Sequence, residues 1–229
     1  IESFRHTEAY PVPYAAQERL VENGAEWTTG LFIESAPNAA FTQSLVKSLR
    51  PDAYSDLGSG IDEVIKSPSD TKKLLSLFGV SHVISLDNNA TDAIGTLKNR
   101  DGTMYYHDTD LGPSALVEPL DPATLTPVTK DWNGAVKDWW RHDITGYLYD
   151  ASNGTISAYT AAKSAVVVER SRTKLVINID AEQAAPVLVK LTYHPQWRAV
   201  DEHGNNVTIH RFSPFLMMIE AKGRVTLTL

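Results

Sequence analysis

The stretch that decides the fold is Pro186–Leu229, which reads PVLVKLTYHPQWRAVDEHGNNVTIHRF over residues 186–212 and SPFLMMIEAKGRVTLTL over 213–229. It contains short runs in which apolar and polar residues alternate, and turn residues such as Gly204 and Gly223 separate these runs. This alternation is typical of strands that bury one face. It is clearest for Val187, Val189, Leu191 and Tyr193, and again for Val225, Leu227 and Leu229.

The same pattern extends towards the N-terminus. Short runs at Ile144–Tyr149, Ala165–Glu169 and Lys174–Asp180, the last of them alternating, predict further strands, and Asn153-Gly154 predicts a turn. One helix-like segment, Asp131–Arg141, precedes them. Many short strands joined by turns are typical of an antiparallel β-sandwich. We therefore predict a jelly-roll-like antiparallel β-sandwich over residues 126–229.

The first half mixes helix and strand signals. Helices are predicted over Tyr14–Asn23, after the N-cap candidate Asn38, and after Ser67, where Pro68 suits the first helical position. Residues 80–86 predict a buried strand. Residues 110–127 contain four prolines and predict a domain boundary. The prediction is an α+β protein with a mixed α/β part over 1–125 packed on the sandwich.

The composition limits the function. The 229 residues include 21 Lys and Arg against 28 Asp and Glu, a formal charge of −7. An acidic chain without a basic patch is not expected to bind nucleic acid. The chain has no cysteine, which excludes disulfides and thiolate metal ligands. We expect no metal and no cofactor. Because the chain starts at Ile1 and stops on an apolar strand, we expect it to be part of a longer protein.

The C-terminal stretch resembles a block in YfhO-type and related GT-C-like multipass bacterial membrane proteins. In that pattern a strand ends in a Tyr-x-Pro-Gly-Trp turn, and a hairpin, an apolar strand, a Gly turn and a last strand follow. The matching residues are Tyr193, Pro195, Trp197, Gly204, Phe215 and Gly223. Gln196 stands where the pattern has Gly, so the turn must avoid positive φ there, or Gln196 must tolerate it. The segment LLSLFGVSHVISL, residues 74–86, is also similar.

The resemblance implies a domain on the extracytoplasmic face of a bacterial cell membrane, attached to membrane spans outside this fragment. It also implies a parent protein that is a cell-envelope glycosyltransferase. The catalytic acids of such families lie in loops between membrane helices, so no catalytic residue is assigned here. The expected partner is a glycan or a lipid-linked sugar.

The aromatic residues between 132 and 149 are the leading ligand-binding candidates. Indole rings stack well on the apolar faces of sugars. We therefore predict sugar contact at Trp139, Trp140, Asp138 and Tyr147. The alternative is that Trp132, Val136, Trp139 and Trp140 form a helical stripe that packs in the core, which is the more usual role of such a stripe. Trp197 is expected in the core.

Two polar clusters have ordinary explanations. His107–Asp110 could bind a metal, but such a site would need more carboxylate and carbonyl ligands, and we expect a solvated turn instead. Asp201–Gly204 has the composition of an active site and also of a polar hairpin turn. The paired acids Asp138 and Asp143 could act in acid/base chemistry, but the sequence does not place them together.

The leading hypothesis is thus a glycan-binding or accessory domain without catalysis of its own. One alternative is a secreted carbohydrate hydrolase, which requires a cleft with two close carboxylates and a raised pKa on one of them. Another is a docking domain for a second envelope protein, which requires an exposed apolar patch.

Overall fold

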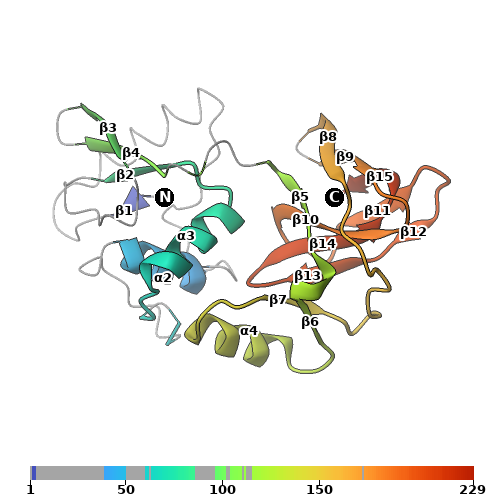
Figure 1. The fold of residues 1–229 in the computed structure, drawn as a ribbon, viewed down its shortest axis with the longest axis horizontal. Coiled ribbons are helices and arrows are strands. Elements are labelled where there is room, and N and C mark those ends of the chain that lie inside the picture. The colour runs from blue at the N-terminus through green and yellow to red at the C-terminus, as the bar shows by residue number, and fades with distance from the viewer. Residues whose placement is uncertain are drawn as a thin grey trace. The chain divides into compact units, whose positions relative to one another are not determined.

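The computed structural model describes residues 2–3, 39–49, 60–61, 63–85, 96–101, 104–109, 111, 115–171 and 173–229 (Figure 1). Within these residues the protein is α+β and mostly β, with three α-helices and three sheets. The chain forms two compact units, residues 1–114 and 115–229. The division falls inside the proline-containing segment predicted as the boundary, and residues 115–125 belong to the second unit. The predicted helix Tyr14–Asn23 lies outside the described residues.

The first unit combines two described helices with a four-stranded sheet. The helices are α2 (Ala39–Leu49) and α3 (Pro68–Leu77), and the sheet has the order β1-β2-β4-β3. Ser67 caps α3 by accepting a hydrogen bond from the backbone N–H of Asp70, so the predicted start of this helix is confirmed. The strands are β1 (Glu2–Ser3), β2 (His82–Ser85), β3 (Thr96–Asp101) and β4 (Met104–Asp108).

The second unit contains two larger sheets. One has six strands in the order β5-β10-β14-β13-β7-β6, and the other has five in the order β12-β11-β15-β9-β8. The strands are β5 (Val117–Pro119), β6 (Leu125–Val128), β7 (Tyr147–Asp150), β8 (Ser164–Arg170), β9 (Lys174–Asp180), β10 (Ala185–Thr192), β11 (Arg198–Asp201), β12 (Asn206–Val207), β13 (Ile209–Phe212), β14 (Leu216–Ala221) and β15 (Gly223–Thr228).

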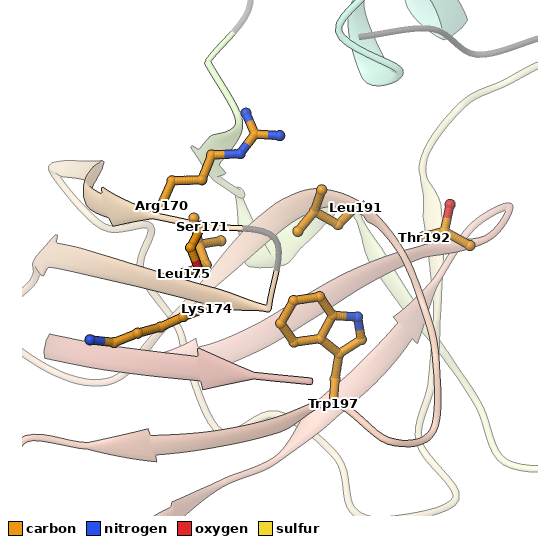
Figure 2. Close-up of a pocket in the computed structure, with 7 residues that line it drawn as sticks. All are labelled: Arg170, Ser171, Lys174, Leu175, Leu191, Thr192 and Trp197. Carbon is orange, nitrogen blue, oxygen red and sulfur yellow. The ribbon is translucent and has the colours of Figure 1, made fainter.

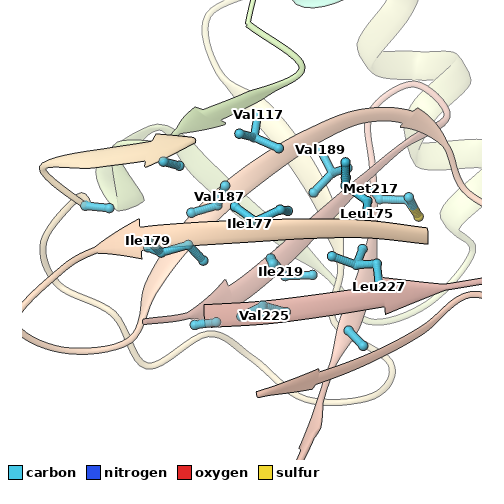
Figure 3. Close-up of a cluster of buried hydrophobic side chains, with 14 of the residues drawn as sticks. Val117, Leu175, Ile177, Ile179, Val187, Val189, Met217, Ile219, Val225 and Leu227 are labelled. Atoms are coloured by element: carbon cyan, nitrogen blue, oxygen red, sulfur yellow. The ribbon is translucent and has the colours of Figure 1, made fainter. Parts of the chain in front are cut away.

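Both sheets contribute side chains to one hydrophobic core (Figure 3). Alternate residues of β9 and β15 point into it from the five-stranded sheet, as the period of two requires. Alternate residues of β10 and β14 point into it from the six-stranded sheet. The fully buried members include Ile177, Val187, Val189, Met217, Ile219, Val225 and Leu227. Burying one such side chain stabilises the fold by roughly 1.5–3 kcal/mol, so this core is the main support of the unit.

One strand pair departs from the antiparallel prediction. β6 and β7 are parallel, while the other strand pairs described in this unit are antiparallel. The reason is the connection, because helix α4 (Trp132–Arg141) lies between β6 and β7 in the chain. Parallel neighbours need a crossover of this kind. β6 is also the last strand of its sheet, which suits Pro127, a residue that cannot donate a ladder hydrogen bond.

The turn of the C-terminal stretch forms as predicted. The Trp197 N–H donates to the carbonyl of His194 at 3.1 Å, and Tyr193 pairs through its N–H with the Phe215 carbonyl at 2.8 Å. Gln196 keeps a negative φ, since Asp131 is the one non-glycine residue with positive φ among those described. The turn therefore avoids the conformation for which the related pattern uses glycine.

Candidate binding site

A cavity of about 230 Å³, which we call the end cavity, opens at one end of the second unit (Figure 2). Its walls come from three places: the hairpin between β8 and β9, the end of β10, and the residue just before β11. Residues from both sheets thus border this cavity. The lining residues are Arg170, Ser171, Lys174, Leu175, Leu191, Thr192 and Trp197.

Trp197 is the largest side chain of this cavity. Its ring packs against the hydrophobic core, as the sequence predicts, but it stays only partly buried. Figure 2 shows the indole reaching into the space beside Leu191. One part of the ring therefore supports the core while another part lines a space open to solvent. Such a half-exposed indole is suited to contact an amphipathic ligand.

The polar residues of the lining are two uncharged ones, Ser171 and Thr192, and two charged ones, Arg170 and Lys174. The Ser171 hydroxyl accepts a hydrogen bond from the Thr173 N–H at 3.4 Å. The ammonium group of Lys174 binds the Glu169 carboxylate at 2.8 Å. In Figure 2 the charged ends of Arg170 and Lys174 point away from the indole. The interior thus offers an aromatic face, aliphatic walls and hydroxyl groups, a combination that fits a neutral polyhydroxylated ring.

The structure brings some of the predicted aromatic residues together. The rings of Trp139 and Tyr147 lie 6.4 Å apart at an angle of 48°, and Tyr147 lies 5.3 Å from Phe212. The Trp139 indole N–H donates to the Gly146 carbonyl at 2.7 Å. Burial, assisted by the negative charge of Glu118, raises the pKa of the Tyr147 hydroxyl. The Trp139 and Tyr147 rings are tilted against each other, and each stays partly exposed.

Trp140 does not meet the prediction of sugar contact. Its side chain is fully buried, at 0% exposure, because it lies on the same side of α4 as the buried residues Trp132 and Val136. The core interpretation of the helical stripe is therefore correct for Trp140. Asp138 lies on the solvent side, with its side chain 74% exposed and its carboxylate 3.8 Å from His142.

The cluster Asp201–Gly204 forms the polar turn that the sequence also allows, whereas the solvated turn expected at His107–Asp110 is wrong, because His107 lies on β4 and is buried together with Thr109. The Asp201 carboxylate accepts hydrogen bonds from the side chain and backbone of Asn205 and from the His203 N–H, and these bonds lower its pKa. That geometry is a hairpin turn. His107 is buried, which lowers its pKa, and Asp110 lies outside the described residues. Within the part of the chain that the structure describes, no three acidic, His or Cys side chains are placed to hold a metal ion.

Sequence reasoning missed the end cavity because it assigned Trp197 wholly to the core. The signal that could have indicated it is the position of Trp197, directly after a turn and before the first residue of a strand. A large ring at the end of a sandwich has core neighbours on one side only. One of the other walls comes from the hairpin between β8 and β9, more than twenty residues earlier, which local pattern does not reveal.

Comparison with family models, with curated proteins and with solved structures finds no match to this chain. Among the described helices none is long and apolar enough to cross a membrane.

Proposed function

We propose that the second unit is a non-catalytic carbohydrate-binding domain, and that the ligand binds in the end cavity against Trp197. The observation that carries this proposal is the half-exposed Trp197 indole in a cavity bordered by the hydroxyl groups of Ser171 and Thr192. Sugar rings present C–H faces to aromatic rings and hydroxyl groups to polar atoms, so both parts of the wall have a partner. We further propose that the two sheets form a jelly-roll-like β-sandwich.

The wider context of this proposal rests on the resemblance of the C-terminal stretch to GT-C-like membrane proteins. In that context the domain sits on the extracytoplasmic face of a bacterial membrane, anchored by segments outside this fragment. It would hold a glycan near the membrane-embedded active site of a glycosyltransferase. The support is the residue pattern of Tyr193, Pro195 and Trp197, which here form a turn closed by the hydrogen bond from the Trp197 N–H to the His194 carbonyl.

The hydrolase alternative finds less support. Neither the end cavity nor a second cavity beside β5 and β8 has an Asp or Glu in its lining. Among the carboxyl groups that the structure describes, hydrogen bonds hold the pKa of Asp150 and that of Asp201 below the usual range. A glycosidase acid needs a raised pKa. The docking alternative relies on exposed apolar side chains, of which Tyr159, at 91% exposure, is the most prominent.

A glycan array followed by calorimetric titration of the best ligand tests the proposal. Thr192→Val removes one hydroxyl from an exposed wall residue, so the fold should survive, and we expect affinity to fall about fivefold, as the loss of one hydrogen bond predicts. Trp197→Ala should abolish binding, with thermal unfolding used to check that the variant is folded. Thr155→Val, at an exposed threonine far from the cavity lining, is the matched control.

The group formed by Asp138, Trp139 and Tyr147 is the second location for the same activity. Trp139→Phe separates the two locations, because it removes the indole there and leaves the end cavity unchanged. Binding that survives Trp139→Phe and is lost in Trp197→Ala places the ligand in the end cavity, whereas the reverse result refutes that placement.

A further inference from the structure

A second cavity, of about 280 Å³, lies along the same edge of the second unit. It is formed where β5, an edge strand of the six-stranded sheet, meets β8, an edge strand of the five-stranded sheet. We call it the seam cavity. Its lining residues are Ala115, Leu116, Val117, Ala165, Val166, Val167 and Arg170.

The two cavities are neighbours, because Arg170 lines both of them. Arg170 is the last residue of β8 and is exposed. Its long aliphatic stem can cover apolar surface while its guanidinium reaches polar atoms. A ligand that occupied both cavities would therefore pass along this side chain.

The chemistry of the two cavities differs. The end cavity combines the Trp197 indole with hydroxyl groups, whereas the seam cavity has only apolar side chains apart from Arg170. Val166 in the seam cavity is 52% exposed, and the nearby Val168 is 47% exposed. Apolar side chains exposed on an edge strand are unusual unless something covers them.

The volumes of the two cavities support the idea that one ligand occupies both. Each cavity alone is smaller than the roughly 300–1,000 Å³ typical of ligand pockets, while both together fall within that range. Either one alone fits a group of about one sugar ring. Both together fit a larger molecule with one polar and one apolar end.

We propose that the two cavities are subsites for one ligand, a glycoside whose sugar binds against Trp197 and whose apolar aglycone binds in the seam cavity. Arg170 is the positioning residue between them. This inference rests on the proposed function, since it assumes that a sugar occupies the end cavity.

Calorimetric titration of the 229-residue chain with octyl β-D-glucoside, below its critical micelle concentration, and with methyl β-D-glucoside tests the inference. The two probes share the sugar and differ only in the length of the aglycone. We expect the octyl glucoside to bind at least about tenfold more tightly, because burial of two methylene groups is enough for that factor. Val166→Ser should remove most of this advantage.

Val168→Ser is the matched control, since it makes the same change at an exposed valine of the same strand that lines neither cavity. Arg170→Gln should weaken the octyl glucoside more than the methyl glucoside. Equal affinity for the two glucosides would overturn the two-subsite inference and leave the sugar site standing. An octyl advantage that survives Val166→Ser would also overturn it. If neither glucoside binds, this inference is contradicted, while the sugar site itself is decided by the glycan array.

Discussion

Arg211 donates through Nε to the Asp150 carboxylate, with 2.7 Å between Nε and Oδ2. The two residues lie on neighbouring strands, β13 and β7. The guanidinium also lies 5.4 Å from the ring centre of Trp132, the first residue of α4, and 6.0 Å from that of Tyr193. This single cation therefore contacts α4 at Trp132, β7 at Asp150, and Tyr193, which precedes the turn that leads to Trp197.

Removing the cation should destabilise the protein. In Arg211→Met the Asp150 carboxylate, whose side chain is only 10% exposed, loses its charged partner. We expect a loss of about 2 kcal/mol, less than for a fully buried pair because the Arg211 side chain is 36% exposed. Denaturant unfolding measures the loss. Lys163→Met breaks the exposed pair with Glu182 and should change stability by less than about 0.5 kcal/mol.

The same pair predicts a pH dependence. Burial alone would raise the pKa of Asp150, but the hydrogen bonds from Ser152 and Arg211 and the charge of Arg211 outweigh it and lower the pKa. The folded state therefore binds a proton less readily than the unfolded state, whose Asp pKa is about 3.9. The stabilisation is complete above that pH and is lost as the pH falls through the lower folded value. Unfolding curves of Asp150→Asn should show a weaker acid dependence than wild type; identical slopes would contradict the assignment.

Much of the second unit could be predicted from local pattern. β9 has the predicted bounds Lys174–Asp180, and α4 starts one residue after the predicted first residue, Asp131, which caps it. Alternation fixes which side of a strand is buried, and caps fix where a helix starts. The parallel pairing of β6 with β7 could not be predicted in this way, because alternation does not reveal strand direction.

The candidate site could be predicted only in part. Trp140 and Trp139 are adjacent in sequence, so one of them had to face away from the core, but the pattern does not say which. The end cavity depends on Leu175 and Leu191, which come from different sheets. Their position beside Trp197 results from tertiary packing, which local sequence patterns do not predict.

The adjacent tryptophans of α4, Trp139 and Trp140, should contribute differently to stability. Trp140→Ala leaves a cavity at a fully buried position and should cost about 3–5 kcal/mol. Trp139→Phe keeps an aromatic ring and loses the hydrogen bond to the Gly146 carbonyl, so about 1 kcal/mol is expected. Thermal and urea unfolding of both variants provide the comparison. Equal losses would show that the burial of Trp140 does not dominate the packing of α4.

Asp131 combines a favourable cap with an unfavourable backbone. Its carboxylate accepts from the Gly134 N–H at 3.1 Å, while its φ of 46° lies in the left-handed region. Asp131→Ala loses the cap and keeps the strain, so we expect a loss of about 1–2 kcal/mol. Asp131→Gly loses the cap but relieves the strain, and it should stay within about 0.5 kcal/mol of wild type. Stability measurements that rank glycine below alanine would refute this explanation.

The most direct test of sugar binding follows the indole N–H signals of the tryptophans by nuclear magnetic resonance. The Trp197 signal is identified by its absence in Trp197→Phe, and the Trp139 signal by its absence in Trp139→Phe. The protein is titrated with a panel of neutral disaccharides. We predict that at least one of them shifts the Trp197 signal in a saturable manner and leaves the Trp139 signal, whose N–H is bonded to Gly146, in place. A panel that moves no indole signal, or moves that of Trp139 and not that of Trp197, would contradict the proposed site.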